Sequence, residues 1–314
     1  MIATEAEGVM TTKKILKREI KTYKLQYFEA QYFELEFEGG TLAYTYTNRL
    51  SQKRVDTLFT KEPTTIVWMD SFKPGEVLFD VGANVGMYSC YAARISGARV
   101  FSFEPESQNY AELNRNIFFN SLHDRVTAYN LAASNVAENS VLYLSQFCPG
   151  YSHHDFGENR WDKPKQLGEL LVKPEERLTQ GCTSIRLDDV VANGTFPQPD
   201  HLKVDVDGFE WKVIDGALKV LSSPKLKTAL IETDNNIPES VKIIDIMTSL
   251  GWKFSYDQMR VNQHEVVSEQ VVKDRIARRK GGQNIVYFRE DSYYDLFRRY
   301  ADTFVAPNPV KSAG

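Results

Sequence analysis

The sequence predicts an α/β fold with a seven-stranded, mostly parallel sheet and helices on both faces. Three observations predict it. Short apolar runs alternate with helical stretches from Val77 to Phe288, as in consecutive βαβ units. A glycine turn, Gly82 to Gly86, follows the first apolar run and opens a helical stretch. Carboxylates, Asp80 and Glu104, stand at the ends of the first two runs. A different pattern precedes Val77, so we expect an N-terminal appendage as well.

The chain of 314 residues suits one large domain with an appendage. We expect the appendage at residues 1–60 and the main domain at 61–290, with an insert at about 134–200. Residues 291–314 should form a helix followed by a disordered tail.

The first secondary-structure elements that we expect lie in the N-terminal appendage. Aromatic and charged residues from Tyr23 to Phe37, then Gly39-Gly40, then Thr41 to Tyr46 predict a β-hairpin around a glycine turn. Arg54 to Thr60 is a candidate short helix. This aromatic segment could form an interface between copies, cover the acceptor site or simply cover the sheet, and the oligomeric state stays open.

The main domain should then alternate strands and helices. The expected strands, of which the last two are antiparallel, are Val77–Val81, Arg99–Phe103, Val126–Leu131, Leu202–Val206, Thr228–Glu232, Trp252–Tyr256 and Asn284–Phe288. The expected helices are Gly86–Ile95, Ser107–Phe119, Asp188–Ala192, Glu210–Leu221, Pro238–Leu250 and Glu265–Lys280. The insert contains a candidate strand, Ser140–Leu144, and a polar segment of a length that is more often functional than a plain connection.

Composition narrows the class of protein. The formal net charge of −4 and the pI near 5.8 do not suggest nucleic-acid binding. Cys90, Cys148 and Cys182 are far apart and odd in number, which favours reduced thiols over a disulfide framework or zinc site. No signal peptide opens the chain, and no apolar run reaches about 18 residues. We therefore expect a cytoplasmic protein without a transmembrane segment, with peripheral membrane contact still open.

The turn Asp80-Val81-Gly82-Ala83-Asn84-Val85-Gly86 predicts the kind of cofactor. Ligands of open α/β sheets bind at the carboxyl ends of the strands. A pyrophosphate site needs backbone N–H groups without a nearby anion, whereas Asp80 occupies the place of the first glycine. A carboxylate there suits the cationic amino-acid end of S-adenosylmethionine. Glu104 follows 24 positions later and could accept both ribose hydroxyls. Singly, Asp80 could cap a helix and Glu104 could be a solvated strand end.

Several motifs in fixed order carry a family resemblance. They are Phe79 to Ser89, Phe103-Glu104-Pro105-Glu106, Asn109 to Asn120, Leu187-Asp188-Asp189, Lys203 to Glu210 and Asn284 to Phe288, with a lead-in from Lys61 to Trp68. With these motifs the sequence resembles the FkbM family of S-adenosylmethionine-dependent methyltransferases over about residues 60–290. The resemblance implies a Rossmann-like class I methyltransferase fold and methyl transfer, usually to a hydroxyl. Family acceptors include polyketides, sugars and surface polysaccharides.

The resemblance also implies site residues. Asp80, Gly82, Asn84 and Gly86 would hold the methionine end of the cofactor, and Glu104 the ribose. Pro105 and Ala132-Ala133 would lie near the adenine. Glu62 is a further candidate for the amino group of the cofactor.

Methyl transfer from a sulfonium depends on holding the acceptor oxygen, the methyl carbon and the sulfur in line. When the acceptor is a hydroxyl, a general base typically raises the rate by about 10²–10⁴-fold. We expect Asp205 to contact the cofactor, and Asp207 or Glu210 to position or deprotonate the acceptor. Asp207 with Gly208 could equally shape the turn before the next helix. His154, in the pair His153-His154, is another candidate base because histidine titrates near neutrality, and a solvated loop is the alternative.

Two further possibilities stay open. The oxygen-bearing side chains at the ends of the fourth and fifth strands could bind Mg²⁺; they are Asp205, Asp207, Glu232, Asp234 and Asn235. The basic residues of the helix 265–280 could cover an anionic acceptor or form a solvated face; they are Arg275, Arg278, Arg279 and Lys280.

The sequence thus predicts an enzyme that methylates a hydroxyl of a sugar, polysaccharide, glycolipid or other small natural product. One alternative is a catalytically silent scaffold that binds S-adenosylmethionine. The other is a nicotinamide-dependent oxidoreductase, which Asp80 and the missing Gly-x-Gly argue against.

Overall fold

A computed structural model describes residues 13–304, apart from 14, 168–169, 235–236, 262–265 and 278–281. The expected tail, His264, Asn235 and the basic residues Arg278, Arg279 and Lys280 therefore lie outside the described residues.

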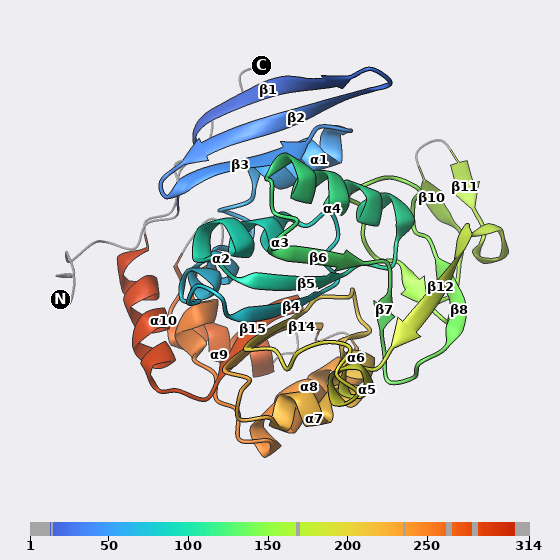
Figure 1. Ribbon diagram of the computed structural model, residues 1–314. Helices are drawn as coiled ribbons and strands as arrows, with labels where there is room; N and C mark the ends of the chain where they lie inside the picture. Colours follow the sequence, from blue (N-terminus) through green and yellow to red (C-terminus); the bar gives the residue numbers. More distant parts are fainter. Residues whose placement is uncertain are drawn as a thin grey trace.

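A six-stranded sheet forms the centre of the molecule (Figure 1). Its strands, in spatial order, are β15 (Gly282–Phe288), β14 (Thr228–Asp234), β13 (His201–Val204), β4 (Val77–Val81), β5 (Arg99–Phe103) and β6 (Val126–Tyr129). β15 is antiparallel to β14, and the other pairs are parallel. Strand β4 lies in the middle with every residue buried, so its carboxyl end faces the switch in strand order between β5 and β13.

The prediction of a seventh strand at Trp252–Tyr256 is wrong within the described residues. Lys253 forms only a single antiparallel bridge to Phe288 at the sheet edge, through two backbone hydrogen bonds of 2.9 Å. Ser255 then caps a 3₁₀ turn, Tyr256–Met259, by accepting from the Asp257 N–H. The side-chain cap turns the backbone away from the edge before a ladder can form.

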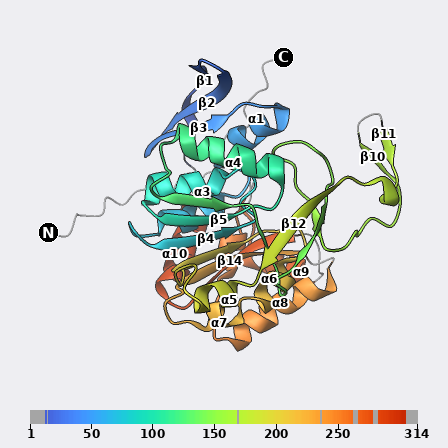
Figure 2. The ribbon, with the colours of Figure 1, turned by 45° about the vertical axis from the view of Figure 1, so that its right-hand side comes forward.

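Helices cover both faces of the sheet (Figures 1 and 2). One face carries α2 (Pro63–Asp70), α3 (Met87–Tyr91) with a π-helical turn at Ala92–Ser96, and α4 (Ser107–Phe119). The other carries α5 (Leu187–Ala192), α6 (Glu210–Asp215), α7 (Leu218–Ser222) and α8 (Pro238–Ser249). Helices α9 (Glu269–Ala277) and α10 (Ser292–Thr303) flank β15 and the Tyr256–Met259 turn. The two faces enclose two separate apolar clusters.

The predicted helix Glu210–Leu221 is divided at Gly216. A Cβ at this glycine would lie 2.1 Å from the Ser134 carbonyl oxygen, so the chain passes very close to the start of the insert. Asp188 accepts hydrogen bonds from the backbone N–H groups of Lys219 and Val220, which starts α7 as a separate helix.

A three-stranded antiparallel sheet precedes the central domain. It consists of β1 (Ile15–Leu25), β2 (Phe28–Phe37) and β3 (Gly40–Thr45), followed by α1 (Arg49–Asp56). The hairpin around Gly39-Gly40 follows the sequence prediction, and β1 adds a strand to it. The Asn116 and Asn120 side chains of α4 bond to the backbone of Thr45 and Ala43, which joins this sheet to the domain.

The insert forms a second small sheet beside the strand ends (Figure 2). Its strands are β7 (Ala132–Ala133), β8 (Asn139–Tyr143), β9 (Asp155–Phe156) and β12 (Thr179–Ile185), with a separate hairpin of β10 (Lys165–Leu167) and β11 (Leu170–Val172). The carboxylate of Asp155 is buried and pairs with Arg160 and Arg177, which anchors β9. The loop between β8 and β9 reaches over the carboxyl end of β4.

Candidate functional site

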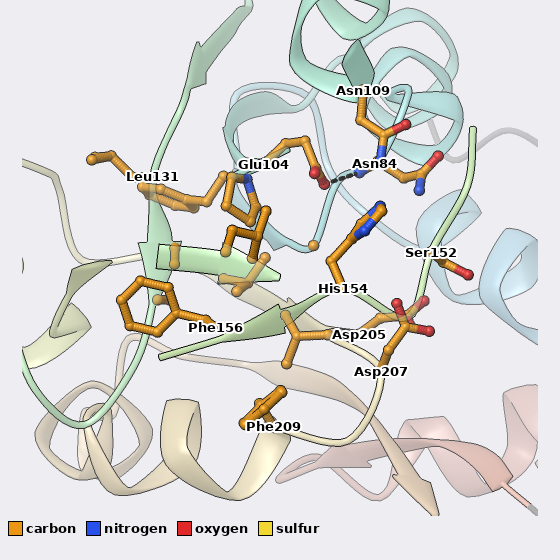
Figure 3. A pocket seen from close by; sticks show the side chains of 18 residues that line it. Asn84, Glu104, Asn109, Leu131, Ser152, His154, Phe156, Asp205, Asp207 and Phe209 are labelled. Carbon is orange, nitrogen blue, oxygen red and sulfur yellow. Dashed lines mark hydrogen bonds between the residues drawn. The ribbon is translucent and has the colours of Figure 1, made fainter. Parts of the chain in front are cut away.

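A cavity opens at the carboxyl ends of β4, β5 and β13, beneath the β8–β9 loop (Figure 3). It encloses about 600 Å³ of space, part of it open to solvent. We call it the first cavity, and its lining residues are Val81, Gly82, Asn84, Phe103, Glu104, Pro105, Asn109, Leu131, Ala132, Ala133, Leu142, Ser152, His154, Phe156, Asp205, Val206, Asp207 and Phe209.

A second cavity of about 500 Å³ shares three residues with the first, namely Gly82, Asn84 and Asp205. The rest of its lining comes from α1, from the lead-in to α2 and from α3, together with Lys203: Arg54, Thr57, Leu58, Lys61, Glu62, Ala83, Met87, Tyr88 and Lys203. Most of its polar side chains are charged, and both positive and negative groups are present. The shared residues make the glycine turn a common wall between the two cavities.

Gly82 is required by the close approach of two strand ends. Its φ is +80°, and a Cβ would lie 1.8 Å from the Asp205 carbonyl oxygen. Gly86 also has a positive φ, and a Cβ there would lie 2.2 Å from the Leu113 side chain. Gly86 lines neither cavity, so it serves helix packing behind the turn.

Glu104 is buried in the wall of the first cavity (Figure 3). Its Oε2 accepts from the Asn84 backbone N–H at 2.8 Å, and its Oε1 accepts from the Glu106 N–H at 2.9 Å. Burial raises the pKa of the carboxyl to about 7. Each ionised oxygen keeps lone-pair capacity for a further donor, such as a ribose hydroxyl.

Asp80 lines neither cavity and is buried behind the turn. Its Oδ2 accepts from the Ser89 hydroxyl at 2.5 Å, and its Oδ1 lies 3.5 Å from the Lys203 ammonium. Lys203 also lies 3.2 Å from Asp205, which does line both cavities. The geometry therefore argues against direct contact of Asp80 with a ligand. Asp80 instead holds Lys203, which positions Asp205.

Asp205 and Asp207 follow the end of β13 and line the first cavity. Burial disfavours ionisation of Asp205, yet the charges of Lys203 and Lys61 hold its pKa below the usual value. The Asp207 pKa is raised by burial and by the neighbouring Asp205 charge. The Asp207 carboxylate accepts from the His153 N–H at 2.8 Å and lies 3.1 Å from its Nδ1. The raised pKa makes the Asp207 carboxylate a stronger base than an ordinary aspartate.

Glu210 lines neither cavity, contrary to its expected role beside an acceptor. Its buried carboxylate accepts from the backbone N–H groups of Val206 and Gly208 at 2.9–3.1 Å. Burial raises its pKa to about 7. Glu210 thus shapes the turn that presents Asp207, which has the left-handed φ of +56°. Both carboxylate oxygens of Glu210 thus accept from backbone N–H groups.

Glu232 at the end of β14 is hydrogen-bonded to Asp205. Burial and the Asp205 charge raise its pKa to about 10, so it is protonated at neutral pH and donates to Asp205. Within the described residues, no three His, Cys, Asp or Glu side chains are grouped as a metal-ligand set.

His154 lies on the β8–β9 loop and points into the first cavity (Figure 3). Its Nδ1 accepts from the Ser145 backbone N–H at 3.1 Å. Burial, followed by the Arg177 charge, lowers its pKa to about 4. A neutral imidazole that accepts at Nδ1 carries its proton on Nε2 and has no free basic nitrogen. This geometry argues against His154 as a general base.

Glu62 lies in the second cavity between two partners. Its Oε1 is 2.8 Å from the Lys61 ammonium, and its Oε2 accepts from the Tyr88 hydroxyl at 3.0 Å. Arg54 is nearby and donates through Nε to the Gly150 carbonyl of the β8–β9 loop at 2.8 Å. This cavity combines cations and carboxylates, which suits a zwitterionic amino-acid group.

Hydrogen bonds hold the β8–β9 loop beside the first cavity. The Tyr151 carbonyl accepts from the Asn84 and Asn109 side chains at 2.8 and 3.0 Å, and the Gly150 N–H donates to Asn109. Sequence reasoning missed the contributions of Asn109, Ser152, Phe156, Arg54 and Tyr88. The long polar insert was the only signal of the loop residues, and nothing local identified Arg54.

Comparisons of the sequence with known proteins show which family the chain resembles. The family model described as the methyltransferase FkbM domain matches residues 80–254, more than half of the chain. The hexuronic acid methyltransferase AglP of Haloferax volcanii is 25% identical over 188 residues, covering 60% of this chain and 69% of that protein. The 31-O-demethyl-FK506 methyltransferase FkbM of Streptomyces tacrolimicus is 28% identical over 159 residues, covering 46% and 60%.

Solved structures show lower sequence identity to this chain than these two relatives do. Precorrin-6y C5,15-methyltransferase from Geobacter metallireducens aligns with a TM-score of 0.35 and 11% identity, covering 71% of this chain and 82% of that chain. Within the described residues, no helix is both long enough and apolar enough to span a bilayer. Because the family model matches most of the central domain and both curated relatives are methyltransferases, the chain belongs to the FkbM methyltransferase family and is an S-adenosylmethionine-dependent methyltransferase.

Proposed function

We propose that this enzyme methylates a hydroxyl of a sugar or a sugar-like natural product. One observation carries the proposal: two cavities of different chemistry meet at Gly82, Asn84 and Asp205. The first cavity has apolar walls and a buried carboxylate. The second has charges of both signs. Together they match the two ends of S-adenosylmethionine.

The adenosine would occupy the first cavity. Glu104 would accept from the ribose hydroxyls, and Pro105, Leu131 and Ala132 would border the adenine. Apolar side chains with a few convergent polar groups are typical of such sites. The residues present therefore fit the nucleoside part of the cofactor.

The methionine end would occupy the second cavity. Its carboxylate would lie near Arg54 and Lys61, and its ammonium near Glu62 and Asp205. When bound, the cofactor supplies a methyl group activated by its positive sulfur. Asp80 would act indirectly, through Lys203.

Asp207 would accept the proton of the acceptor hydroxyl. It lines the first cavity, its pKa is raised, and Glu210 holds the turn that carries it. The relatives named for a hexuronic acid and for 31-O-demethyl-FK506 support a hydroxyl acceptor on a sugar or another natural product. Both relatives are similar proteins, and neither specifies the acceptor here.

The test measures S-adenosylmethionine binding by calorimetry and methyl transfer to a panel of hexuronic acids, neutral sugars and hydroxylated macrolides. Asp207→Asn should bind the cofactor as the wild type does and lower kcat by about 10²–10⁴-fold, the range for loss of a general base. Glu104→Gln should weaken cofactor binding instead. Wild-type binding without transfer to any acceptor would favour the silent scaffold. An unchanged kcat in Asp207→Asn would remove Asp207 as the base.

A further inference from the structure

The β8–β9 loop carries one polar atom that the protein leaves without a partner. The Nε2 of His154 is buried and makes no hydrogen bond to the described residues. The other ring nitrogen, Nδ1, accepts from the Ser145 N–H at 3.1 Å. A backbone N–H can only donate, so Nδ1 is unprotonated and Nε2 carries the hydrogen. A buried N–H donor without an acceptor is unfavourable, so such groups nearly always have a partner.

The surroundings show where this N–H is directed. His154 lines the first cavity together with Glu104, Asn84 and Asn109, and its ring points toward them (Figure 3). The nearby Tyr151 carbonyl already accepts from Asn84 and Asn109. The Asp207 carboxylate lies next to His153 instead. Burial lowers the pKa of His154, and the Tyr151 backbone lies close enough to the imidazole to oppose that shift. Two amide donors, however, already use both lone pairs of the Tyr151 carbonyl. A ligand in the cavity is therefore the better acceptor for the Nε2–H.

We propose that the Nε2–H of His154 donates a hydrogen bond to a ribose hydroxyl oxygen of the bound cofactor. A hydroxyl both donates and accepts. It can donate its hydrogen to Glu104 and accept the Nε2–H of His154 on its oxygen. This inference rests on the proposed placement of the adenosine in the first cavity. It makes His154 a cofactor-binding residue supplied by the insert, with no part in proton transfer.

The neutral state of the imidazole is consistent with this role. Burial and the Arg177 charge lower the pKa of His154 to about 4, so the ring stays uncharged at neutral pH. Arg177 is itself buried and pairs with Asp155, and it donates to the Tyr143 carbonyl at 2.7 Å. The pairing of Asp155 with Arg177 thus holds both the loop and the charge that keeps His154 neutral.

Two substitutions test the roles of the two ring nitrogens separately. Asn can accept the Ser145 N–H where Nδ1 does and has nothing at the position of Nε2. Gln reaches that position with an amide N–H and lacks the group at Nδ1. We would measure S-adenosylhomocysteine binding by calorimetry for wild type, His154→Asn and His154→Gln, with thermal unfolding as the folding control.

The donor role predicts that His154→Asn weakens binding by about five- to tenfold, the usual effect of one lost hydrogen bond. His154→Gln should stay within about threefold of wild type. Unchanged binding in His154→Asn, or weaker binding in His154→Gln than in His154→Asn, would overturn the proposal. The second pattern would mean that Nδ1 acts only by holding the loop.

If both variants bind weakly, analogues of S-adenosylhomocysteine that lack the 2′- or the 3′-hydroxyl show whether His154 contacts the ribose. If His154 contacts a hydroxyl, the penalty of His154→Asn disappears with the analogue that lacks it. An equal penalty with both analogues would contradict the contact. If the wild type itself fails to bind S-adenosylhomocysteine, the proposed function fails before His154 is tested.

Discussion

Glu104 shows how burial sets the chemistry of a single residue. Two backbone N–H groups donate to its oxygens, yet burial dominates and raises its pKa to about 7. At neutral pH the empty site is therefore divided between the acid and the carboxylate. A ribose hydroxyl binds best to the carboxylate, because the ionised group is the stronger acceptor.

The pH dependence of cofactor binding follows from this shift. Binding requires Glu104 to lose its proton, so affinity should fall as pH drops through about 7 and level off above about 8. One linked proton gives roughly fivefold weaker binding at pH 6 than at pH 7. Calorimetric titrations between pH 5.5 and 8.5 measure the effect. Glu104→Gln should bind weakly with a flat profile, and a flat wild-type profile would contradict the assignment.

At the scale of elements, side-chain caps decide where helices begin. Asp188 is buried and accepts from the N–H groups of Lys219 and Val220, so α7 starts there and does not continue from α6. The family motif that contains Asp188 is therefore structural in this chain. Its contribution is the register of α7 against the sheet.

Replacement of this cap should destabilise the fold without altering the site. We expect Asp188→Ala to lower the free energy of unfolding by about 1–2 kcal/mol, since the backbone N–H groups of Lys219 and Val220 lose their acceptor. The exposed neighbour gives a matched control: Asp189→Ala should change it by less than about 0.5 kcal/mol. Urea denaturation measures both. Equal effects at the two positions would exclude the capping explanation.

At the scale of the whole molecule, the N-terminal sheet shares an apolar cluster with the methyltransferase domain. Phe33, Leu35 and Tyr44 are buried in the same cluster as Leu78 of β4 and Leu113 of α4. The Tyr44 hydroxyl donates to the Met87 carbonyl beside the glycine turn. We propose that residues 15–45 fold together with the central domain and support the second cavity from outside.

Loss of packing in this sheet should therefore weaken the whole domain. Leu35→Ala removes a fully buried side chain and should cost about 2–5 kcal/mol in a single cooperative transition. Leu16, which is exposed on β1, is the control, and Leu16→Ala should be nearly neutral. Tryptophan fluorescence and circular dichroism should follow one denaturation curve in Leu35→Ala. Two separate transitions would show that the appendage is an independent unit.

The sequence by itself determined the α/β class, the chain order of the six central strands, the cofactor and the strand-end positions of Gly82, Glu104 and Asp205. Local periodicity and turn chemistry carry that information, because each strand and each glycine turn is specified by neighbours in the chain. The tertiary structure decided the rest. It placed Asp80 beside Lys203, away from both cavities, and it placed the Glu210 carboxylate in a backbone turn. It also brought Arg54 to the second cavity.

His154 shows the physical reason for this division. Its sequence neighbours suggest only a polar loop, and histidine chemistry suggests a base. The Ser145 N–H decides which ring nitrogen carries the hydrogen, and burial with the Arg177 charge decides that the ring is neutral. All of these come from the folded insert. A side chain's protonation and direction depend on contacts between distant segments, and local sequence does not encode them. The fold class was therefore predictable, whereas the role of each polar group was not.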